Sequence, residues 1–334
     1  MRARWPWVLL LVALLALGPQ FLKSYQVYLL SLAAVYALAA LGLNLLTGYA
    51  GQISLGHAGF LAIGGYSAAL LQVKLAWPLW ASLPAAGLLT ALLGLVLVIP
   101  ALRLSEIYLA IATLGFGVAV EQLLPQWAWT GGHQGFSIPR PELFGLALNS
   151  DLAFYYLILA VGLALVWIAA NAVRAPLGRA FVAIRDNELA AQALGISLAR
   201  TKSYAFLLSA FYTGIAGALY ANLVGYLNVS TFNLGLSILL LSMIAVGGLA
   251  SIPGSLLGAA FLGLLPQVLS GFSAWVPQFI YGAALLLVVI FMPYGIWGFL
   301  LQTVGRGRGL MRSARRLFPG PRAESGSTGG DDHA

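Results

Sequence analysis

Charged side chains are scarce in this chain: Asp, Glu, Lys and Arg make up 8% of its 334 residues. A soluble domain carries about 25% charged residues, so this chain has too few to cover a surface that faces water. Hydrophobic residues make up 61% and form long runs, such as Tyr155–Ala170 and Phe279–Met292. A backbone in lipid must satisfy its own hydrogen bonds, and continuous apolar runs indicate helices rather than the short alternating segments of a β-barrel. The expected fold class is therefore an all-α, polytopic integral membrane protein.

Cysteine is absent, and so are the usual signatures of nucleotide and metal sites. The lack of cysteine excludes disulfides, thiolate metal sites and thiol nucleophiles. The sequence contains no GxxxxGK[ST] P-loop, no HExxH motif and no histidines at metal-ligand spacing. Ser54 and His57 lie three residues apart without an acidic residue nearby, so a catalytic nucleophile is not expected. The sequence therefore predicts neither an enzyme nor a bound cofactor or metal ion.

Ten apolar segments approach the roughly 20 residues that a membrane-spanning helix needs. They are Trp5–Leu22, Val27–Thr47, His57–Val73, Leu79–Pro100, Glu106–Pro125, Leu152–Ala172, Tyr204–Val224, Leu234–Leu249, Ser255–Phe272 and Pro277–Trp297. The first also fits a signal peptide, but cleavage after Gly18 would leave Pro19 at the new N-terminus, which favours a retained anchor. Two Gly-rich segments fit broken or re-entrant helices as well as complete spans, so we expect eight to ten transmembrane helices.

The basic side chains are distributed unevenly across the predicted membrane. If the N-terminus lies inside, 14 of the 17 Lys and Arg residues fall on the inner side, and Lys23, Lys74 and Arg140 fall outside. Lys and Arg are enriched in cytoplasmic loops, so both termini are expected to be cytoplasmic. Residues 1–300 are expected to form one membrane domain. Residues 301–334 would be a tail, with a basic part at Arg306–Arg322 that binds anionic lipid, followed by a disordered end.

Two connections exceed the usual length between helices. The outer one, at about 126–151, is rich in Gly and Pro turn signals. The inner one, at about 172–203, mixes apolar residues such as Phe181 and Leu189 with charged ones, which predicts one or two short helices outside the bilayer that end at Gly195. A plain solvated connector is the alternative. The length and helical pattern of the inner loop favour a docking surface for a cytoplasmic partner.

The stretch GYAGQISLGHAGF, residues 48–60, gathers four glycines with Gln52, Ser54 and His57. Glycine disfavours a helix interior by roughly 1 kcal/mol relative to alanine, so a break is expected here. The stretch is either a bend between two spans or a broken helix. Close packing would explain the glycines but not the three polar residues, which we interpret as part of a path or a gate. Whether His57 touches a substrate is open on the sequence alone.

A second polar stripe lies along the fifth predicted span. Glu106, Ala110, Thr113, Gly117 and Glu121 recur at helical spacing on one face. Small and polar residues on a span face protein or water rather than lipid. Thr113 and Gly117, near the middle, are candidates for lining a path, whereas Glu121 is interpreted as a residue of the membrane interface.

Several motifs resemble one family over about residues 26–300. LNLLTGYAGQISLGHAGFLAIGGYSAAL, TGGHQGFSIPRP, GRAFVAIRDNELAAQALGI and GGLASIPGSLLGAAFLG are similar to LivM-type permease subunits of branched-chain amino acid ABC importers, in the same order. The resemblance implies the ABC importer permease fold and a multi-pass protein of the bacterial inner membrane. It also implies four partner chains: a second, LivH-type permease subunit, two cytoplasmic ABC ATPase subunits and a periplasmic substrate-binding protein. Nucleic acid is not an expected partner.

The same resemblance assigns a role to the inner loop. Its ELAAQALG part is similar to the EAAxxxG segment with which importer permeases dock on their ATPase, although Glu188 lies one residue early. The implied coupling residues are Arg185, Asp186, Glu188, Ala190, Ala191 and Gly195. In the outer loop, residues 130–135 would face the binding protein or the outer mouth, or would form a plain turn.

The resemblance implies Leu, Ile and Val as substrates, with ATP hydrolysed by the partner subunits. Related permeases carry urea, short amides or aromatic acids, which are the alternative substrates. The few polar residues within the spans favour a substrate with a sizeable apolar part. An ion-coupled secondary carrier is less well supported, because such carriers usually hold carboxylates inside the membrane and the acidic residues here lie near span ends. A membrane-embedded enzyme would need a catalytic constellation that this sequence lacks.

Overall fold

The structure is a computed structural model that describes residues 17–104, 106–139, 142–143, 146–147, 150–268, 282–283, 286 and 295–304. Most of the expected first and tenth spans, and the tail after Val304, lie outside these residues. The regular structure of the described part is almost entirely helical. Its strands are four two-residue segments that form two antiparallel pairs, β1 (Phe136–Ser137) with β4 (Tyr226–Leu227) and β2 (Glu142–Leu143) with β3 (Leu146–Ala147).

Six helical stretches of the described part are long and apolar enough to cross a membrane. They are α2 (Ser24–Asn44) with the π-helical η3 (Leu45–Tyr49), α3 (His57–Leu75), α4 (Leu79–Gly94) with η4 (Leu95–Leu97) and α5 (Val98–Arg103), α6 (Glu106–Leu123) with η5 (Leu124–Gln126), α7 (Asp151–Arg174) and α10 (Leu198–Val224). They correspond to the expected second to seventh spans. The prediction of an all-helical, multi-pass membrane protein is confirmed.

Shorter apolar helices stand where the eighth and ninth spans were expected. They are α11 (Leu234–Gly247) and α12 (Ile252–Val268), and α14 (Gly295–Val304) follows them in the described chain. At 1.5 Å per residue, the 14 residues of α11 cover about 21 Å, which is less than the roughly 30 Å of a bilayer core. Helix α11 alone is therefore too short to cross the membrane.

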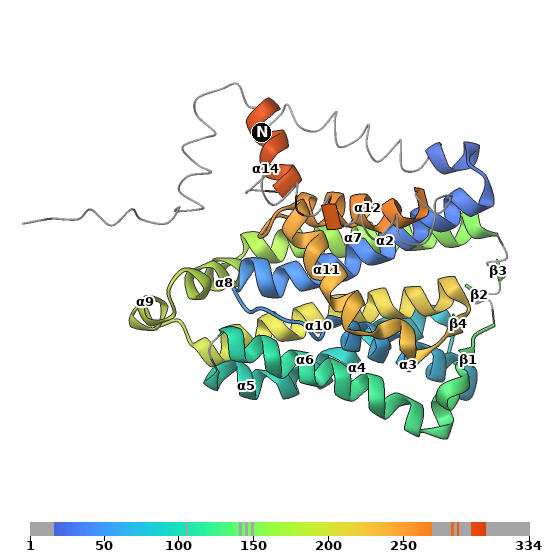
Figure 1. The fold of residues 1–334 in the computed structure, drawn as a ribbon, viewed down its shortest axis with the longest axis horizontal. Helices are drawn as coiled ribbons and strands as arrows, with labels where there is room; N and C mark the ends of the chain where they lie inside the picture. Colours follow the sequence, from blue (N-terminus) through green and yellow to red (C-terminus); the bar gives the residue numbers. More distant parts are fainter. Residues whose placement is uncertain are drawn as a thin grey trace, which may run out of the picture.

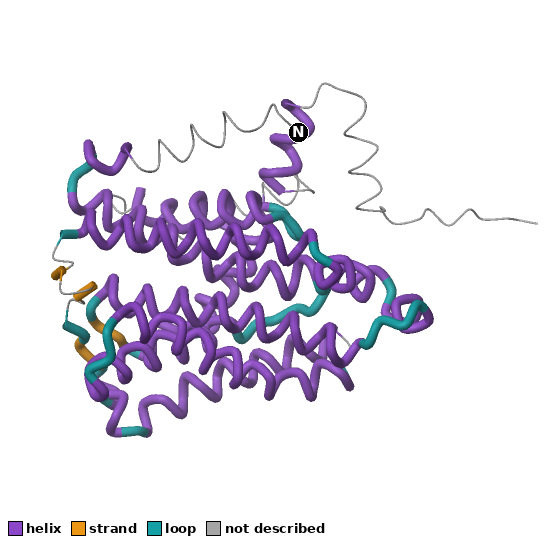
Figure 2. The backbone as a smooth tube through the Cα atoms, turned by 180° about the vertical axis from the view of Figure 1, so that it is seen from behind, coloured by secondary structure: helices purple, strands orange, loops and turns teal. Residues whose placement is uncertain are grey.

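Helix α10 is the centre of the bundle. It packs against α2, α3 and α4, while α2 also packs against α7 and α12. Figure 1 shows the resulting arrangement, and the view from behind in Figure 2 shows the same helices in two layers that meet along α2 and α10. Glycines allow the closest of these contacts, because a Cβ at Gly64 of α3 would lie 2.2 Å from the Gly214 carbonyl oxygen of α10.

The helical conformation is interrupted between α2 and α3, as the sequence predicts. Helix α2 ends in η3, residues 50–56 are not helical, and α3 begins at His57. The break has its own hydrogen bonds: the Gln52 N–H donates to the Leu46 carbonyl at 3.1 Å, and the Thr47 hydroxyl donates to the Gln52 carbonyl at 3.0 Å. We call residues 50–56 the unwound segment.

Helices α8 (Pro176–Asp186) and α9 (Glu188–Ala193) project beyond one end of the bundle (Figure 1). The Asn187 side chain caps α9 by accepting a hydrogen bond from the Ala190 N–H at 2.9 Å. Gly195, with φ +82, follows the helix in the left-handed conformation that commonly ends one. The expected short helices and their end at Gly195 are confirmed. We refer to Pro176–Ala193 as the α8–α9 segment.

The opposite end of the bundle carries the connection between α6 and α7. Three 3₁₀ turns, η5, η6 (Ala128–Thr130) and η7 (Gly132–Gln134), lead into β1, which pairs with β4 after α10. Thr130 is buried, and its hydroxyl oxygen lies 2.6 Å from the Leu124 carbonyl oxygen and 2.7 Å from that of Trp127. Gly131, Gly132 and Gly135 all have positive φ, so local backbone geometry accounts for this glycine cluster. A short 3₁₀ helix, η8 (Val229–Phe232), then joins β4 to α11.

Candidate functional site

His57 lies in a closed polar cluster at the centre of the bundle. Its Nδ1 lies 2.8 Å from the Ser54 hydroxyl oxygen, and its Nε2 lies 2.7 Å from the Ser209 hydroxyl oxygen of α10. All three side chains have no exposed surface. A neutral imidazole donates at one nitrogen and accepts at the other, and a serine hydroxyl can fill either role. Both ring nitrogens are therefore satisfied by hydroxyls, in a cluster that joins the unwound segment, α3 and α10.

Helix α6 packs directly on the unwound segment through Thr113 and Gly117. The Leu55 N–H donates to the Thr113 hydroxyl at 3.0 Å, and that hydroxyl donates to the Ala110 carbonyl at 2.9 Å. A Cβ at Gly56 would lie 2.0 Å from the Thr113 carbonyl oxygen, so no larger residue fits there. A Cβ at Gly117 would lie 3.1 Å from the Gly56 Cα. The structure thus brings these two predicted residues of α6 against the same break that holds Ser54 and His57.

Gln52 lies in the same segment and is buried, with 4% of its surface exposed. The hydrogen bonds that fix its position run through its backbone, to Leu46 and Thr47. Four predicted residues, Gln52, Ser54, His57 and Thr113, are therefore sealed from the outside in this conformation.

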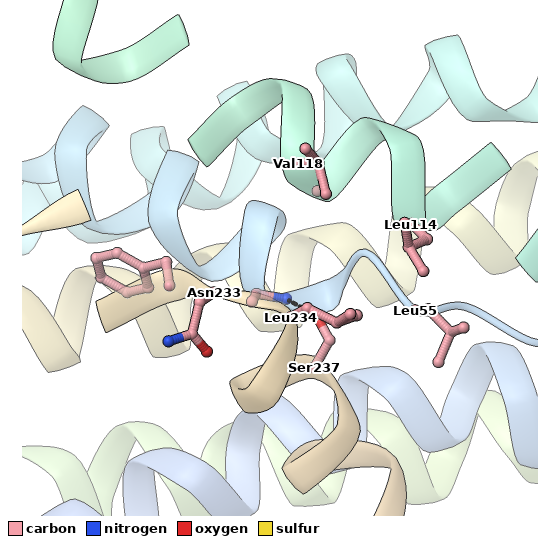
Figure 3. A pocket seen from close by; sticks show the side chains of 9 residues that line it. Leu55, Leu114, Val118, Asn233, Leu234 and Ser237 are labelled. Carbon is pink, nitrogen blue, oxygen red and sulfur yellow. Dashed lines mark hydrogen bonds between the residues drawn. The ribbon is translucent and has the colours of Figure 1, made fainter. Parts of the chain in front are cut away.

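A small recess opens beside this cluster, where the unwound segment, α6 and the start of α11 meet (Figure 3). Its free volume is about 10 Å³, roughly the space of one water molecule. The lining residues are Leu55, Ala58, Leu114, Gly117, Val118, Phe232, Asn233, Leu234 and Ser237. The Ser237 hydroxyl accepts a hydrogen bond from the Ala58 N–H at 2.9 Å, which ties α11 to the first turn of α3. Apart from Asn233 and Ser237 the lining is apolar or glycine.

Asn44, the last residue of α2, connects the break to the turn between α11 and α12. Its side-chain amide donates to the Ser251 carbonyl at 3.0 Å and to the Ser255 hydroxyl at 2.6 Å, and its Oδ1 accepts from the Ala250 N–H at 3.0 Å. Ala250 has φ +55, which costs a non-glycine residue roughly 1 kcal/mol or more. Asn44 thus holds a strained turn against the end of α2.

Arg185 of α8 contacts the residues on either side of the start of the break, Gly48 and Gly51. Its Nη1 donates to the Gly48 carbonyl at 3.0 Å, while its Nε and Nη2 donate to Asp186 Oδ1 at 3.1 and 3.0 Å. Its Cγ lies 2.8 Å from where a Cβ on Gly51 would stand, and Gly51 has φ +73. The predicted coupling loop and the predicted gate stretch are therefore in direct contact.

Glu188 makes a second connection from the α8–α9 segment. Its Oε1 lies 2.7 Å from Lys202 Nζ at the start of α10, and Lys202 also donates to the Ala101 carbonyl of α5 at 3.0 Å. Lys202 is buried, whereas the Glu188 side chain is 42% exposed. Ala191 is buried, and Ala190 and Gly195 are exposed. Beside them Leu189 and Leu194 expose 78% and 81% of their surface.

The predicted site omits residues that the structure places at its centre. These are Asn44, Ser209, Ser237 and Lys202. Each of them bonds to a residue that lies 100 or more positions away in the sequence, so local periodicity could not reveal that pairing. The available signal is compositional: an isolated amide, hydroxyl or amine in an apolar helix needs a buried partner.

These observations define a class: a multi-pass helical membrane protein with a broken helix at its centre and a two-helix segment projecting from one end. The family model "Branched-chain amino acid transport system / permease component" matches residues 25–291. The chain belongs to this family, and it is an ABC-type importer permease, a membrane subunit that is not itself an enzyme.

Two groups of relatives are similar to the chain. The high-affinity branched-chain amino acid transport system permease protein LivM of Escherichia coli (strain K12) is 36% identical over 86% of this chain and 74% of its own length. LivM of Salmonella typhimurium (strain LT2) is 35% identical over the same shares. The autoinducer 2 import system permease protein LsrC of Escherichia coli O9:H4 (strain HS) is 29% identical over 96% of this chain and 94% of its own. No solved structure is significantly similar to the chain.

Proposed function

We propose that this chain forms the translocation path for leucine, isoleucine and valine in an ABC importer of the bacterial inner membrane. Its partners would be a second, LivH-type permease subunit, two ATPase subunits that hydrolyse ATP, and a periplasmic substrate-binding protein. Residues 1–300 would be the permease domain and residues 301–334 a tail on the ATPase side. The observation that carries the proposal is the α8–α9 segment, a protruding pair of helices that contacts the broken helix at the centre of the bundle and exposes Leu189, with Leu194 exposed directly after it.

The exposed leucines support an ATPase as the partner of the α8–α9 segment. Leu189 and Leu194 are large apolar side chains on a projection that stands clear of the bundle (Figure 1). Apolar groups gathered on such a projection mark an interaction site. Ala190 is exposed between them and lets a partner surface approach the helix closely, while Glu188 offers a charge at the rim. In this proposal the coupling residues Arg185, Asp186, Ala191 and Gly195 shape the segment and fix its position.

The polar cluster supports a gate at the unwound segment. Ser54, His57 and Thr113 are fully buried and hydrogen-bonded, so in this conformation they close the bundle rather than line an open passage. Non-helical backbone at membrane depth is tolerated where it is covered by protein or borders a water-filled cavity. In the proposal Gln52, Ser54, His57, Thr113 and Gly117 form this gate, and the passage opens when the unwound segment moves.

The chemistry of the recess lining favours an aliphatic substrate, while in this closed conformation the recess has room for about one water molecule. Leu55, Leu114 and Val118 face it from the unwound segment and α6, and two polar side chains border it (Figure 3). An apolar lining with few polar groups suits a branched side chain better than urea, because burying a polar group without partners is costly. The LivM relatives are also more similar to this chain than LsrC is.

Reconstitution tests the proposal. The chain is placed in proteoliposomes with its proposed second permease, ATPase subunits and binding protein, and uptake of labelled leucine is measured with and without ATP on the ATPase side. We expect ATP-dependent uptake, competed by isoleucine and valine and not by urea, an aromatic acid or autoinducer 2. Uptake by this chain alone without ATP would instead show a secondary carrier. Competition by urea with no effect of valine would overturn the substrate assignment.

A further inference from the structure

The guanidinium group of Arg185 turns into the bundle although α8 projects from it. Its side chain is only 20% exposed, whereas Asp186 next to it is 53% exposed. Phe181 and Ile184 on the same helix are buried, with 1% and 2% exposed. Arg185 therefore lies on the inner face of α8 with these two residues, and other elements of the chain cover most of its side chain.

Arg185 donates to the Gly48 carbonyl, which lies among the last carbonyl groups of its helical stretch. The last carbonyl groups of a helix have no partner within it, and they form the negative end of the helix dipole. At the end of α2 the Gln52 N–H goes to the Leu46 carbonyl, and the Gly48 carbonyl takes the Arg185 Nη1 proton at 3.0 Å. Arg185 thus caps η3, the π-helical end of this span, where the unwound segment begins.

Asp186 fixes the direction of that cap. Its Oδ1 accepts from both Nε and Nη2 of Arg185, which leaves Nη1 aimed at Gly48. The stem of the arginine lies on Gly51, where even a methyl group would stand 2.8 Å from Arg185 Cγ. The guanidinium group thus bonds to Gly48, and the aliphatic part of the side chain packs on Gly51, so Arg185 contacts both ends of this turn.

The same segment ends at the polar cluster, a few residues further on. In it, Ser54 bonds to His57 and Leu55 bonds to Thr113. Only two residues separate Gly51 from Ser54, so a backbone displacement at Gly48–Gly51 should also move Ser54 and Leu55. A matched arginine lies elsewhere on α8: within the described part of the chain, Arg179 donates to the carbonyl of Arg174, the last residue of α7, at 3.3 Å. The two arginines of α8 therefore differ in whether they touch the break.

We infer that Arg185 is a positioning residue that holds the unwound segment in its closed arrangement, and that it is not a contact residue for the ATPase. The inference rests on the proposed function, because it assigns to one residue of the coupling segment a contact inside the bundle rather than a contact with the ATPase. When α8 shifts with its partner, Arg185 carries that shift to Gly48, and the segment follows. Leu189 of α9, and Leu194 directly after it, remain the residues that meet the partner.

Cysteine labelling tests the inference, because the chain has no cysteine of its own. Gln52→Cys places a thiol in the buried part of the unwound segment, and its reaction with a water-soluble maleimide is followed in membrane fragments open on both sides, with the complex assembled and no ATP added. Arg185→Ala should raise the labelling rate roughly tenfold, the change expected for losing one charge-assisted hydrogen bond. Arg185→Lys, which keeps the charge and loses the fork, should fall between, and Arg179→Ala should match the parent.

Capture of the ATPase subunits by each variant gives the second readout. Arg185→Ala should retain the ATPases at the parent level while transport falls. Weaker capture with an unchanged labelling rate would show a docking residue and overturn the inference. Gly51→Ala serves if Arg185→Ala does not assemble, because it displaces the arginine stem and should also raise labelling; an unchanged rate in that variant counts against the inference. The labelling needs no transport, so a failed leucine uptake experiment leaves it interpretable.

Discussion

The Nε2 atom of His57 lies 2.7 Å from the hydroxyl oxygen of Ser209, which joins the first residue of α3 to the middle of α10. Both residues are fully buried, and the Ser54 hydroxyl occupies the other ring nitrogen. The histidine is therefore a bridge between two elements rather than a free acid or base. Its value to the protein lies in holding the start of α3 against α10.

His57→Phe should destabilise the protein more than Ser209→Ala. The first change leaves two buried hydroxyls without their partner, and each buried unsatisfied group costs about 1–3 kcal/mol. The second change leaves one ring nitrogen unpaired. Thermal unfolding of the solubilised complex measures both, with Ser203→Ala as control, because that hydroxyl bonds only to Ala199 within α10. Equal stability of His57→Phe and the parent would remove the bridging role.

Gly56→Ala should abolish transport and impair assembly. A Cβ at this position would stand 2.0 Å from the Thr113 carbonyl oxygen, so α6 and the unwound segment must separate. Gly115→Ala on α6 is the matched control, because within the described part of the chain no atom beyond its own helix backbone and chain neighbours lies within 4 Å of its Cβ position, and alanine suits a helix better than glycine. Leucine uptake and the yield of assembled complex measure the difference. A normal uptake rate in Gly56→Ala would show that this contact is dispensable.

Leu189→Ser should weaken the capture of ATPase subunits without changing the stability of the chain. The side chain is 78% exposed, and exposed substitutions usually change the free energy of unfolding by less than about 0.5 kcal/mol. Gln192→Ser, an exposed change in the same helix, is the control. Co-purification of the ATPases and the melting temperature are measured side by side. Loss of stability without loss of capture would assign Leu189 to the fold.

The Glu188–Lys202 ion pair should show coupling in a double-mutant cycle. Glu188→Ala removes the carboxylate from the buried Lys202 ammonium and leaves that ammonium its hydrogen bond to the Ala101 carbonyl. Glu188→Ala should therefore cost more stability in the parent than in the Lys202→Met background. Because Glu188 is 42% exposed, the coupling free energy should be about 1 kcal/mol or less. Unfolding of the four proteins measures it. Additive effects would mean that the two side chains act independently.

The sequence predicted the helices well where apolar length decided the outcome. The segment at Val27–Thr47 corresponds to α2 within three residues at each end, and the segment at Tyr204–Val224 corresponds to α10 except that the helix begins six residues earlier, at Leu198. The glycine-rich stretch at residues 48–60 predicted a break, which the structure places at residues 50–56, and the mixture of charges in the inner loop located α8 and α9. These features depend on the local chain, so a local pattern is enough to find them.

The partners of the polar residues could not be predicted in the same way. His57 was singled out, but Ser209 lies 152 positions later in a helix with several other hydroxyls, and nothing local distinguishes it. Arg185 was assigned to the coupling segment from its place in the loop, whereas its contact with Gly48 depends on how α8 folds back on the end of α2. Such pairings follow from the packing of whole helices.

The unwound segment also has a consequence for water. Two N–H groups at its end and just beyond it donate to side-chain hydroxyls of other helices: Leu55 to Thr113, and Ala58 to Ser237. When the segment leaves these hydroxyls, the freed N–H groups need new acceptors, and in a passage between helices water can supply them. In the proposed gate, opening and wetting therefore belong to a single event, because water takes the place of the threonine and serine hydroxyls that bond to these N–H groups here.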